Sequence, residues 1–264
     1  MNITCRDISL LTLVGLMGYV STEQVAREFF PSLDRARRRL RLLFDKSFLS
    51  ISVTGSTKPN LISLTKTGLR LASETSPDLA DRLRLAGPIR LSEAERHLLL
   101  VDVRLYAAAL GELRNEPLVR WSSADSVLGR ELGLHEFHLE PDALAEFATD
   151  QGRVCVAIEL DNGTEPAWSG LVRKLGRYRE AARAGCLDNL WCVVQGGKEK
   201  QEAIRKRLRE EGLEEFGQAL THELVICRPV REPATRDETR DEKRAEGPTT
   251  LFTHAQERLL NRGV

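Results

Sequence analysis

The second half of the chain is organised around the run RVCVAIELDNGTE, residues 153–165, in which the apolar residues of a strand lead to two carboxylates. A turn signal, Asp150-Gln151-Gly152, precedes it, and the segment Phe137–Ala148 before that turn is also strand-like. The sequence therefore predicts a hairpin of two antiparallel strands. Asp142 lies near the start of the first strand and Glu159 near the end of the second, so the hairpin brings both carboxylates to one end of the sheet.

A helix is predicted directly after this hairpin, over Ala167–Ala184. It carries Lys174 and Tyr178 four residues apart and hence on one face. Further elements are predicted on both sides: helix Glu93–Leu113, strand Leu118–Trp121, helix Ser123–Leu132, strand Leu190–Gln195, helix Glu199–Glu211 and strand Glu223–Cys227. The alternation of helices and strands indicates a mixed sheet flanked by helices.

The N-terminal part predicts a different arrangement, with three helices followed by a β-hairpin. Ser21 can cap the second helix by accepting a hydrogen bond from the free N–H groups of its first turn. Helices are expected over residues 7–19, Thr22–Phe29, from a Ser32 or Asp34 cap to about Lys46, and over Leu69–Glu74, with strands at Phe48–Val53 and Leu61–Leu64. Three helices and a hairpin are typical of the winged form of the helix-turn-helix.

The third helix has a basic outer face. Its apolar residues recur at helical spacing and are expected to face a core: Leu33, Ala36, Leu40, Leu43 and Phe44. Outside this stripe lie Arg35, Arg37, Arg38, Arg39 and Arg41. Guanidinium groups on such a helix can enter the major groove of double-stranded DNA and bond to phosphates or guanine. We expect these arginines, together with Lys58 on the wing, to bind DNA; the alternative is that they only form a solvated helix face.

The carboxylates of the second half are suited to a divalent metal. Mg²⁺ takes oxygen ligands, usually one or two carboxylates with water and phosphate. The candidate metal ligands are Asp142, Glu159, Glu131 and Asp161. A Mg²⁺ or Mn²⁺ ion held there could activate water for phosphodiester cleavage.

Two residues of the following helix could complete such a site. Lys174 could stabilise the charge that develops in the transition state, with Tyr178 beside it. Asp142, Glu159, Lys174 and Tyr178 are therefore the candidate catalytic residues. The alternative is that Asp142 and Asp161 are turn residues, and that Lys174, Arg177 and Arg173 pair with acidic neighbours to hold the helix to the sheet.

Composition limits the remaining choices. The net charge is zero, so DNA affinity must come from local patches. Five cysteines without a Cys-x-x-Cys pair favour reduced thiols in a cytoplasmic protein, and no apolar run is long enough for a membrane span. Residues 230–264 are rich in charges and helix breakers, which favours a largely disordered segment with a short terminal helix. The expected organisation has four parts: a winged-helix domain over 1–76, a linker and connecting helix over 77–116, a mixed α/β domain over 117–229, and the charged segment 230–264.

Two sets of residues resemble the replication-relaxation family of bacterial plasmid and mobile-element proteins, over about residues 7–228. In the first half they are YVSTEQVA (19–26), RARRRLRLL (35–43) and LTKTG (64–68); in the second half they are EPDA (140–143), ELDNGTE (159–165) and KLGRY (174–178). The resemblance implies an α+β fold: an N-terminal winged helix-turn-helix, a connecting helix, and a C-terminal mixed α/β domain resembling the PD-(D/E)xK nuclease fold. Where the nuclease motif has lysine, this chain has Asp161, and Lys174-x-x-x-Tyr178 resembles the Gln-x-x-x-Tyr helix of the exonuclease branch.

The resemblance, taken with the basic third helix and the paired carboxylates, implies one function and leaves two alternatives. The first is a DNA-binding protein of a plasmid or other mobile element, acting in replication, relaxation or mobilisation or as a transcriptional regulator. The second is a Mg²⁺- or Mn²⁺-dependent deoxyribonuclease. The third is a non-enzymatic repressor or scaffold that binds a protein partner through its C-terminal domain. A homodimer fits the tendency of winged helices to pair, and no membrane partner is expected.

Overall fold

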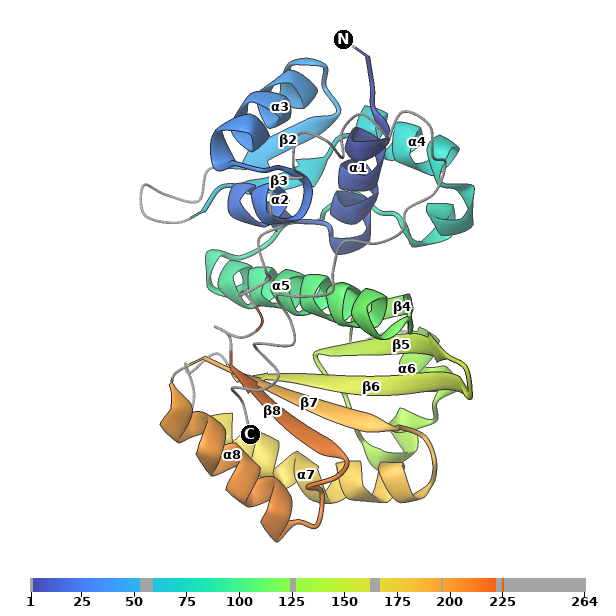
Figure 1. The fold of residues 1–264 in the computed structure, drawn as a ribbon, viewed down its shortest axis with the longest axis vertical. Helices are drawn as coiled ribbons and strands as arrows, with labels where there is room; N and C mark the ends of the chain where they lie inside the picture. Colours follow the sequence, from blue (N-terminus) through green and yellow to red (C-terminus); the bar gives the residue numbers. More distant parts are fainter. Residues whose placement is uncertain are drawn as a thin grey trace, which may run out of the picture. The chain divides into compact units, whose positions relative to one another are not determined.

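The computed structural model describes residues 2–52, 59–123, 127–161, 167–195, 197–221 and 225 (Figure 1). The chain divides into two compact units, with the boundary between Leu91 and Ser92. No helix in this described part combines the length and the apolar character needed to cross a membrane.

The first unit combines α-helices with a small three-stranded antiparallel sheet. Its elements are α1 (Cys5–Met17), β1 (Val20–Ser21), α2 (Thr22–Phe29), α3 (Leu33–Asp45), β2 (Leu49–Ser52), β3 (Leu61–Leu64), α4 (Lys66–Thr75) and the 3-10 helix η1 (Pro77–Arg82). The strands pair in the order β1-β3-β2. This order of helices and hairpin is the one expected from the sequence, and α2 has the expected bounds.

Side-chain caps determine where the helices of the first unit begin. The Ser21 hydroxyl accepts from the Gln24 N–H at 3.1 Å, and the Gln24 side chain accepts from the Ser21 N–H at 2.9 Å. This reciprocal pair is a capping box, which satisfies two backbone donors at once. Ser32, rather than Asp34, caps α3 by accepting from the Arg35 N–H at 3.4 Å.

The buried stripe of α3 is narrower than its apolar pattern suggests. Ala36, Leu40 and Leu43 are buried, whereas Phe44 is 46% exposed. The expectation that Phe44 faces the core is therefore wrong. At about 100° per residue, Phe44 lies about 80° around the helix from Ala36, at the edge of the buried stripe.

The second unit is built on a five-stranded mixed sheet in the order β4-β5-β6-β7-β8. Its elements are α5 (Leu91–Arg114), β4 (Leu118–Ser123), α6 (Val127–Glu131), the 3-10 helix η2 (Leu134–Phe137), β5 (Ala143–Thr149), β6 (Gly152–Asp161), α7 (Ala167–Arg183), β7 (Asn189–Val194), α8 (Lys198–Glu210) and β8 (Gly217–Thr221). The pairs β4–β5 and β5–β6 are antiparallel, and β6–β7 and β7–β8 are parallel.

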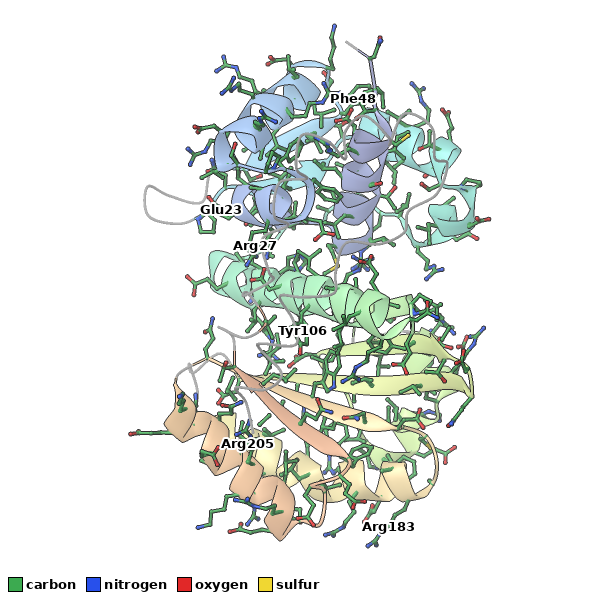
Figure 2. The ribbon with its side chains drawn as sticks, viewed as in Figure 1. Glu23, Arg27, Phe48, Tyr106, Arg183 and Arg205 are labelled. Carbon is green, nitrogen blue, oxygen red and sulfur yellow. The ribbon has the colours of Figure 1, made fainter. Side chains whose placement is uncertain are left out.

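Helices cover both faces of this sheet (Figure 1). On one face, Leu99, Val103 and Ala107 of α5 pack against strand residues such as Ile158 and Val193. Tyr106 of α5, labelled in Figure 2, lies edge-on to Trp191 of β7, with ring centroids 5.9 Å apart. The other face is covered by α6, η2, α7 and α8, from Leu128, Leu134, Leu175, Tyr178, Ile204 and Leu208. Helix α5, expected to connect two domains, is thus one layer of the second unit.

Two strands of the second unit differ from those expected. Strand β5 begins at Ala143 and not at Phe137, because Leu134–Phe137 forms a 3-10 turn and His138 has a left-handed backbone with φ 51°. The last described strand, β8, spans Gly217–Thr221 and was not expected; the expected strand Glu223–Cys227 lies outside the described residues except for Val225, which is helical. The sequence GQALT of β8 has little of the β-branched and aromatic content that marks strands, which explains the error.

Candidate functional site

Helix α3 presents four exposed arginines: Arg35, Arg37, Arg38 and Arg41. Ala36, Leu40 and Leu43 face the core, so helix geometry sends these arginines to the outer surface. Arg37 Nη1 lies 4.0 Å from Asp34 Oδ1, and both side chains are more than half exposed. This ion pair therefore contributes little to stability. The outer surface of α3 is therefore basic and open to a polyanion.

Arg39 differs from these four arginines. Its guanidinium contacts the carboxylate of Asp7 in α1, with Nε 2.7 Å from Oδ1. Burial raises the pKa of Asp7, but hydrogen bonds from Arg39 and Thr4 outweigh it and hold that pKa below the usual value. Arg39 is thus committed to an internal ion pair. Lys58 lies outside the described residues.

The second cluster lies at one edge of the five-stranded sheet, where β5 begins and β6 ends. Asp142 immediately precedes β5, and Ala143 pairs with Ile158 of β6. The Asp142 carboxylate accepts from the Leu160 N–H at 2.7 Å and contacts the guanidinium of Arg96 from α5. Asp142 therefore caps the end of β6 and joins α5 to the sheet.

Glu159 is buried on the face of the sheet that α7 covers. Lys174 Nζ lies 2.8 and 3.0 Å from its two carboxylate oxygens, and the Tyr178 hydroxyl donates to Oε1 at 2.6 Å. Burial raises the pKa of Glu159 most strongly, Lys174 opposes this, and the charge of Asp142 adds to it; the net pKa is above the usual value. The pKa of Tyr178 is also raised, because the hydroxyl is buried beside Glu159.

Helix α7 is tied to the segment before β5 by two further contacts. Lys174 Nζ donates to the Glu140 carbonyl at 3.3 Å, and Arg177 donates to the His138 carbonyl at 3.1 Å. An ammonium group has three donors, and the three contacts of Lys174 with Glu159 and Glu140 account for them. Lys174 thus holds the helix to the sheet while it neutralises Glu159.

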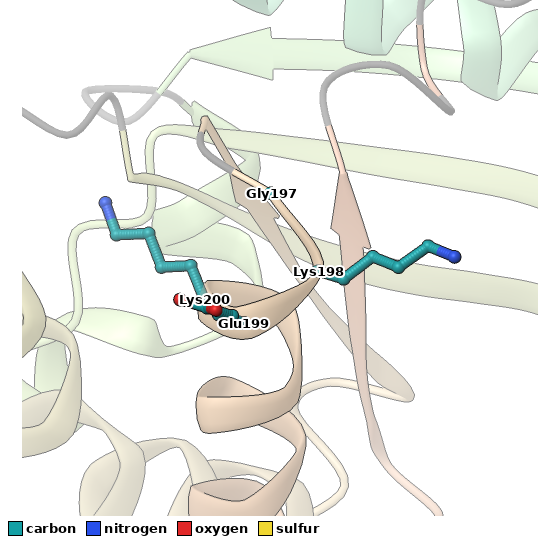
Figure 3. Close-up of a pocket in the computed structure, with 4 residues that line it drawn as sticks. All are labelled: Gly197, Lys198, Glu199 and Lys200. Carbon is teal, nitrogen blue, oxygen red and sulfur yellow. The ribbon is translucent and has the colours of Figure 1, made fainter.

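Asp161, the last residue of β6, pairs with a third helix. Its Oδ2 lies 2.8 Å from Nζ of Lys200 in α8. The first turn of α8 lines an open hollow formed by Gly197, Lys198, Glu199 and Lys200, from which the two lysines point in opposite directions (Figure 3). The three carboxylates at this sheet edge are thus each paired with a cation from a different helix: Arg96 of α5, Lys174 of α7 and Lys200 of α8.

Comparison with known proteins identifies the family of this chain. The family model described as replication-relaxation matches residues 11–190, which is more than half of the chain. The chain belongs to the replication-relaxation family. No curated protein and no solved structure matches it significantly. Membership indicates a function related to the replication or relaxation of a mobile element.

In this replication-relaxation protein, the acids expected to bind a metal do not fit that role as they are arranged. Both oxygens of Glu159 are bound by Lys174, and Asp142 is bound by Arg96 and a backbone N–H. Glu131 pairs with Arg120 of β4 at 2.8 Å. Among the described residues, no group of three or more His, Cys, Asp or Glu side chains is placed to hold a metal. A metal would have to displace cations that the chain itself supplies.

Three residues of this replication-relaxation protein matter to these sites but were not found from the sequence: Asp7, Arg96 and Lys200. Each lies far in sequence from its partner, so helical spacing gives no sign of the contact. The one sequence signal was Thr4 three residues before Asp7, the pattern of a capping box, which marks Asp7 as an ordered side chain.

Proposed function

We propose that this replication-relaxation protein binds double-stranded DNA through the outer surface of α3. The observation that carries the proposal is the exposed set Arg35, Arg37, Arg38 and Arg41 on one capped helix. In a winged helix-turn-helix, the corresponding helix docks in the major groove. The order α1, α2, α3 and the β2–β3 hairpin supports this assignment.

The distribution of charge supports the same surface. The whole chain has no net charge, so attraction to DNA must come from a local excess of cations. Arginine can bond to a phosphate or pair with guanine through two parallel hydrogen bonds. The four arginines of α3 would therefore supply both the affinity and part of the sequence recognition.

The salt dependence of DNA binding tests the proposal. Four phosphate contacts give a slope of log affinity against log salt of about −3.6, since each contact contributes about −0.9. Arg38→Ala with Arg41→Ala should reduce the slope to about −1.8 and weaken binding to any duplex. Fluorescence anisotropy with a labelled duplex at several salt concentrations measures both quantities.

Arg70→Ala is the matched control, because Arg70 lies in the same unit on α4 and is largely exposed beside Glu74. Its affinity and slope should equal those of the unchanged protein. An unchanged slope in the Arg38/Arg41 double variant would refute the proposal.

We also propose that the second unit does not bind a metal ion at the end of the sheet where Asp142 and Glu159 lie. The support is the pairing of each acid with its own cation. Supercoiled, linear and single-stranded DNA incubated with the protein and Mg²⁺ or Mn²⁺ should remain uncut. Cleavage that disappears in Glu159→Gln would show that this edge is catalytic.

A further inference from the structure

Arg39 of α3 points into the first unit, whereas Arg38 and Arg41 of the same helix are exposed. Its guanidinium forms two contacts with the Asp7 carboxylate: Nε lies 2.7 Å from Oδ1, and Nη2 contacts Oδ2. Nη2 also donates to the Asn2 carbonyl at 2.9 Å. The Asp7 side chain is 1% exposed and that of Arg39 is 21% exposed. The ion pair is therefore largely removed from water.

Asp7 is held on a second side as well. The Thr4 N–H and the Thr4 hydroxyl each donate to Asp7 Oδ2 at 2.7 Å. The bond from the Thr4 N–H belongs to the capping box that starts α1. The carboxylate thus has an orientation set by α1, and the pair joins the first turn of α1 to the middle of α3.

This contact fixes how α3 is rotated about its own axis. A guanidinium and a carboxylate joined by two parallel hydrogen bonds share a plane, so the pair tolerates little rotation. Arg38 is adjacent to Arg39, and Arg41 is two residues away. Any rotation of α3 that breaks the pair with Asp7 would turn these exposed arginines by the same angle.

We propose that Asp7 and Arg39 are positioning residues for the DNA-binding surface of α3, and that Arg39 itself contacts neither phosphate nor base. The proposal rests on the proposed function, DNA binding through α3. A phosphate could recruit Arg39 only by leaving the buried Asp7 carboxylate without its cation, which is strongly unfavourable. The exposed Arg38 has no such competing partner among its described contacts.

The removal of the Asp7 charge gives the sharpest test. Taking a negative charge from a DNA-binding surface ordinarily strengthens binding, because the repulsion of phosphate is lost. If Asp7 positions α3, Asp7→Asn should instead raise the Kd for a duplex about three- to tenfold. Arg39→Met should raise it equally, and the double variant should bind no more weakly than either single variant, since both changes break one contact.

The variant Arg39→Lys separates positioning from a direct contact. Lysine keeps the positive charge but cannot form the planar two-bond pair, so Arg39→Lys should bind DNA as weakly as Arg39→Met. Arg70→Lys is the matched control and should leave the Kd unchanged, because Arg70 is largely exposed on α4, outside the proposed DNA-binding surface. All affinities are measured well below the unfolding temperature of each variant, followed by circular dichroism.

Several outcomes would overturn the inference. Tighter binding by Asp7→Asn would show that Asp7 restrains a DNA-contacting Arg39. Recovery of affinity in Arg39→Lys would show that the charge alone matters, and a lower unfolding temperature with unchanged Kd would show a purely structural pair. Should Asp7→Asn fail to fold, the Kd of Arg39→Lys decides between the two roles.

The Arg38/Arg41 double variant distinguishes failure of the inference from failure of the proposed function. If that variant also binds normally, the proposed function has failed as well; if it loses affinity, only the positioning role has failed.

Discussion

Glu159 combines burial with a complete set of partners. It is 6% exposed, and its oxygens are bound by Lys174 and Tyr178. A buried carboxylate is tolerated only where such partners replace water. The raised pKa of Glu159 shows that these partners compensate burial only in part.

Replacement of Lys174 by methionine should destabilise the second unit by about 2 kcal/mol at pH 7. This lies below the ~3–5 kcal/mol for a fully buried pair, since a third of the Lys174 side chain is exposed. The loss should shrink as the pH falls through the raised pKa of Glu159, because a protonated carboxyl needs no cation. Urea unfolding at pH 7 and pH 5 measures the change. The double variant Lys174→Met with Glu159→Gln should lose less at pH 7 than Lys174→Met alone, and an equal or larger loss would contradict the explanation.

At the scale of elements, the start of α4 depends on a glycine. A Cβ atom at Gly68 would lie 2.0 Å from the carbonyl oxygen of Phe48, which belongs to the backbone and cannot move aside cheaply. Gly176 lies within α7, and a Cβ there would meet nothing within 4 Å. These two glycines therefore have opposite roles.

Gly68→Ala should destabilise the first unit by at least about 2 kcal/mol through this overlap. Gly176→Ala should stabilise α7 by about 0.5–1 kcal/mol, because alanine loses less conformational freedom in a helix interior. Thermal unfolding of both variants provides the measurement. Equal unfolding temperatures would mean that α4 can shift away from Phe48.

Local signals predicted the elements better than the contacts between them. The cap at Ser21 and the apolar spacing of α3 placed those helices, because caps and amphipathic faces are encoded within a few residues. The partner of Arg39 lies 32 residues away, so the helix pattern could not separate Arg39 from the exposed arginines. Asp142, Glu159, Lys174 and Tyr178 were correctly expected to converge, because a tight hairpin and the next helix join them. Arg96 of α5 and Lys200 of α8 were missed, because their contacts with Asp142 and Asp161 depend on how these helices pack against the sheet.

For the whole molecule, the two units should respond differently to acid. The pKa of Asp7 is lowered below 3.8 in the folded state, so its contribution is present above that pH and is lost as the pH falls through the folded pKa. The pKa of Glu159 is raised above 4.5, so its contribution is present below that pH and is lost as the pH rises through the folded pKa. Acidification therefore removes the stabilising contribution of the Asp7 charge, and it also removes the destabilising contribution of the buried Glu159 charge.

Hydrogen exchange, followed separately for α1 with α3 and for β6 with α7, measures this difference. As the pH is lowered from 7 to 4, the protection of amide protons in β6 and α7, corrected for intrinsic exchange, should rise. The rise should be larger than the one measured for the same amides in Glu159→Gln. Below pH 4, protection of α1 and α3 should fall, and less so in Asp7→Asn. A fall around Glu159 that matches the one around Asp7 would contradict the assigned directions.

Asp142, Glu159 and Asp161 lie at one end of the sheet, and each pairs with a cation from a different helix. This arrangement has an evolutionary consequence. Loss of Lys174 alone leaves a buried charge, whereas joint loss of Lys174 and Glu159 leaves none. The same holds for Asp161 with Lys200 and, more weakly because the Asp142 side chain is 13% exposed, for Asp142 with Arg96. Across homologous sequences, the two members of each pair should therefore be exchanged together, so that three co-varying couples link one end of the sheet to three separate helices.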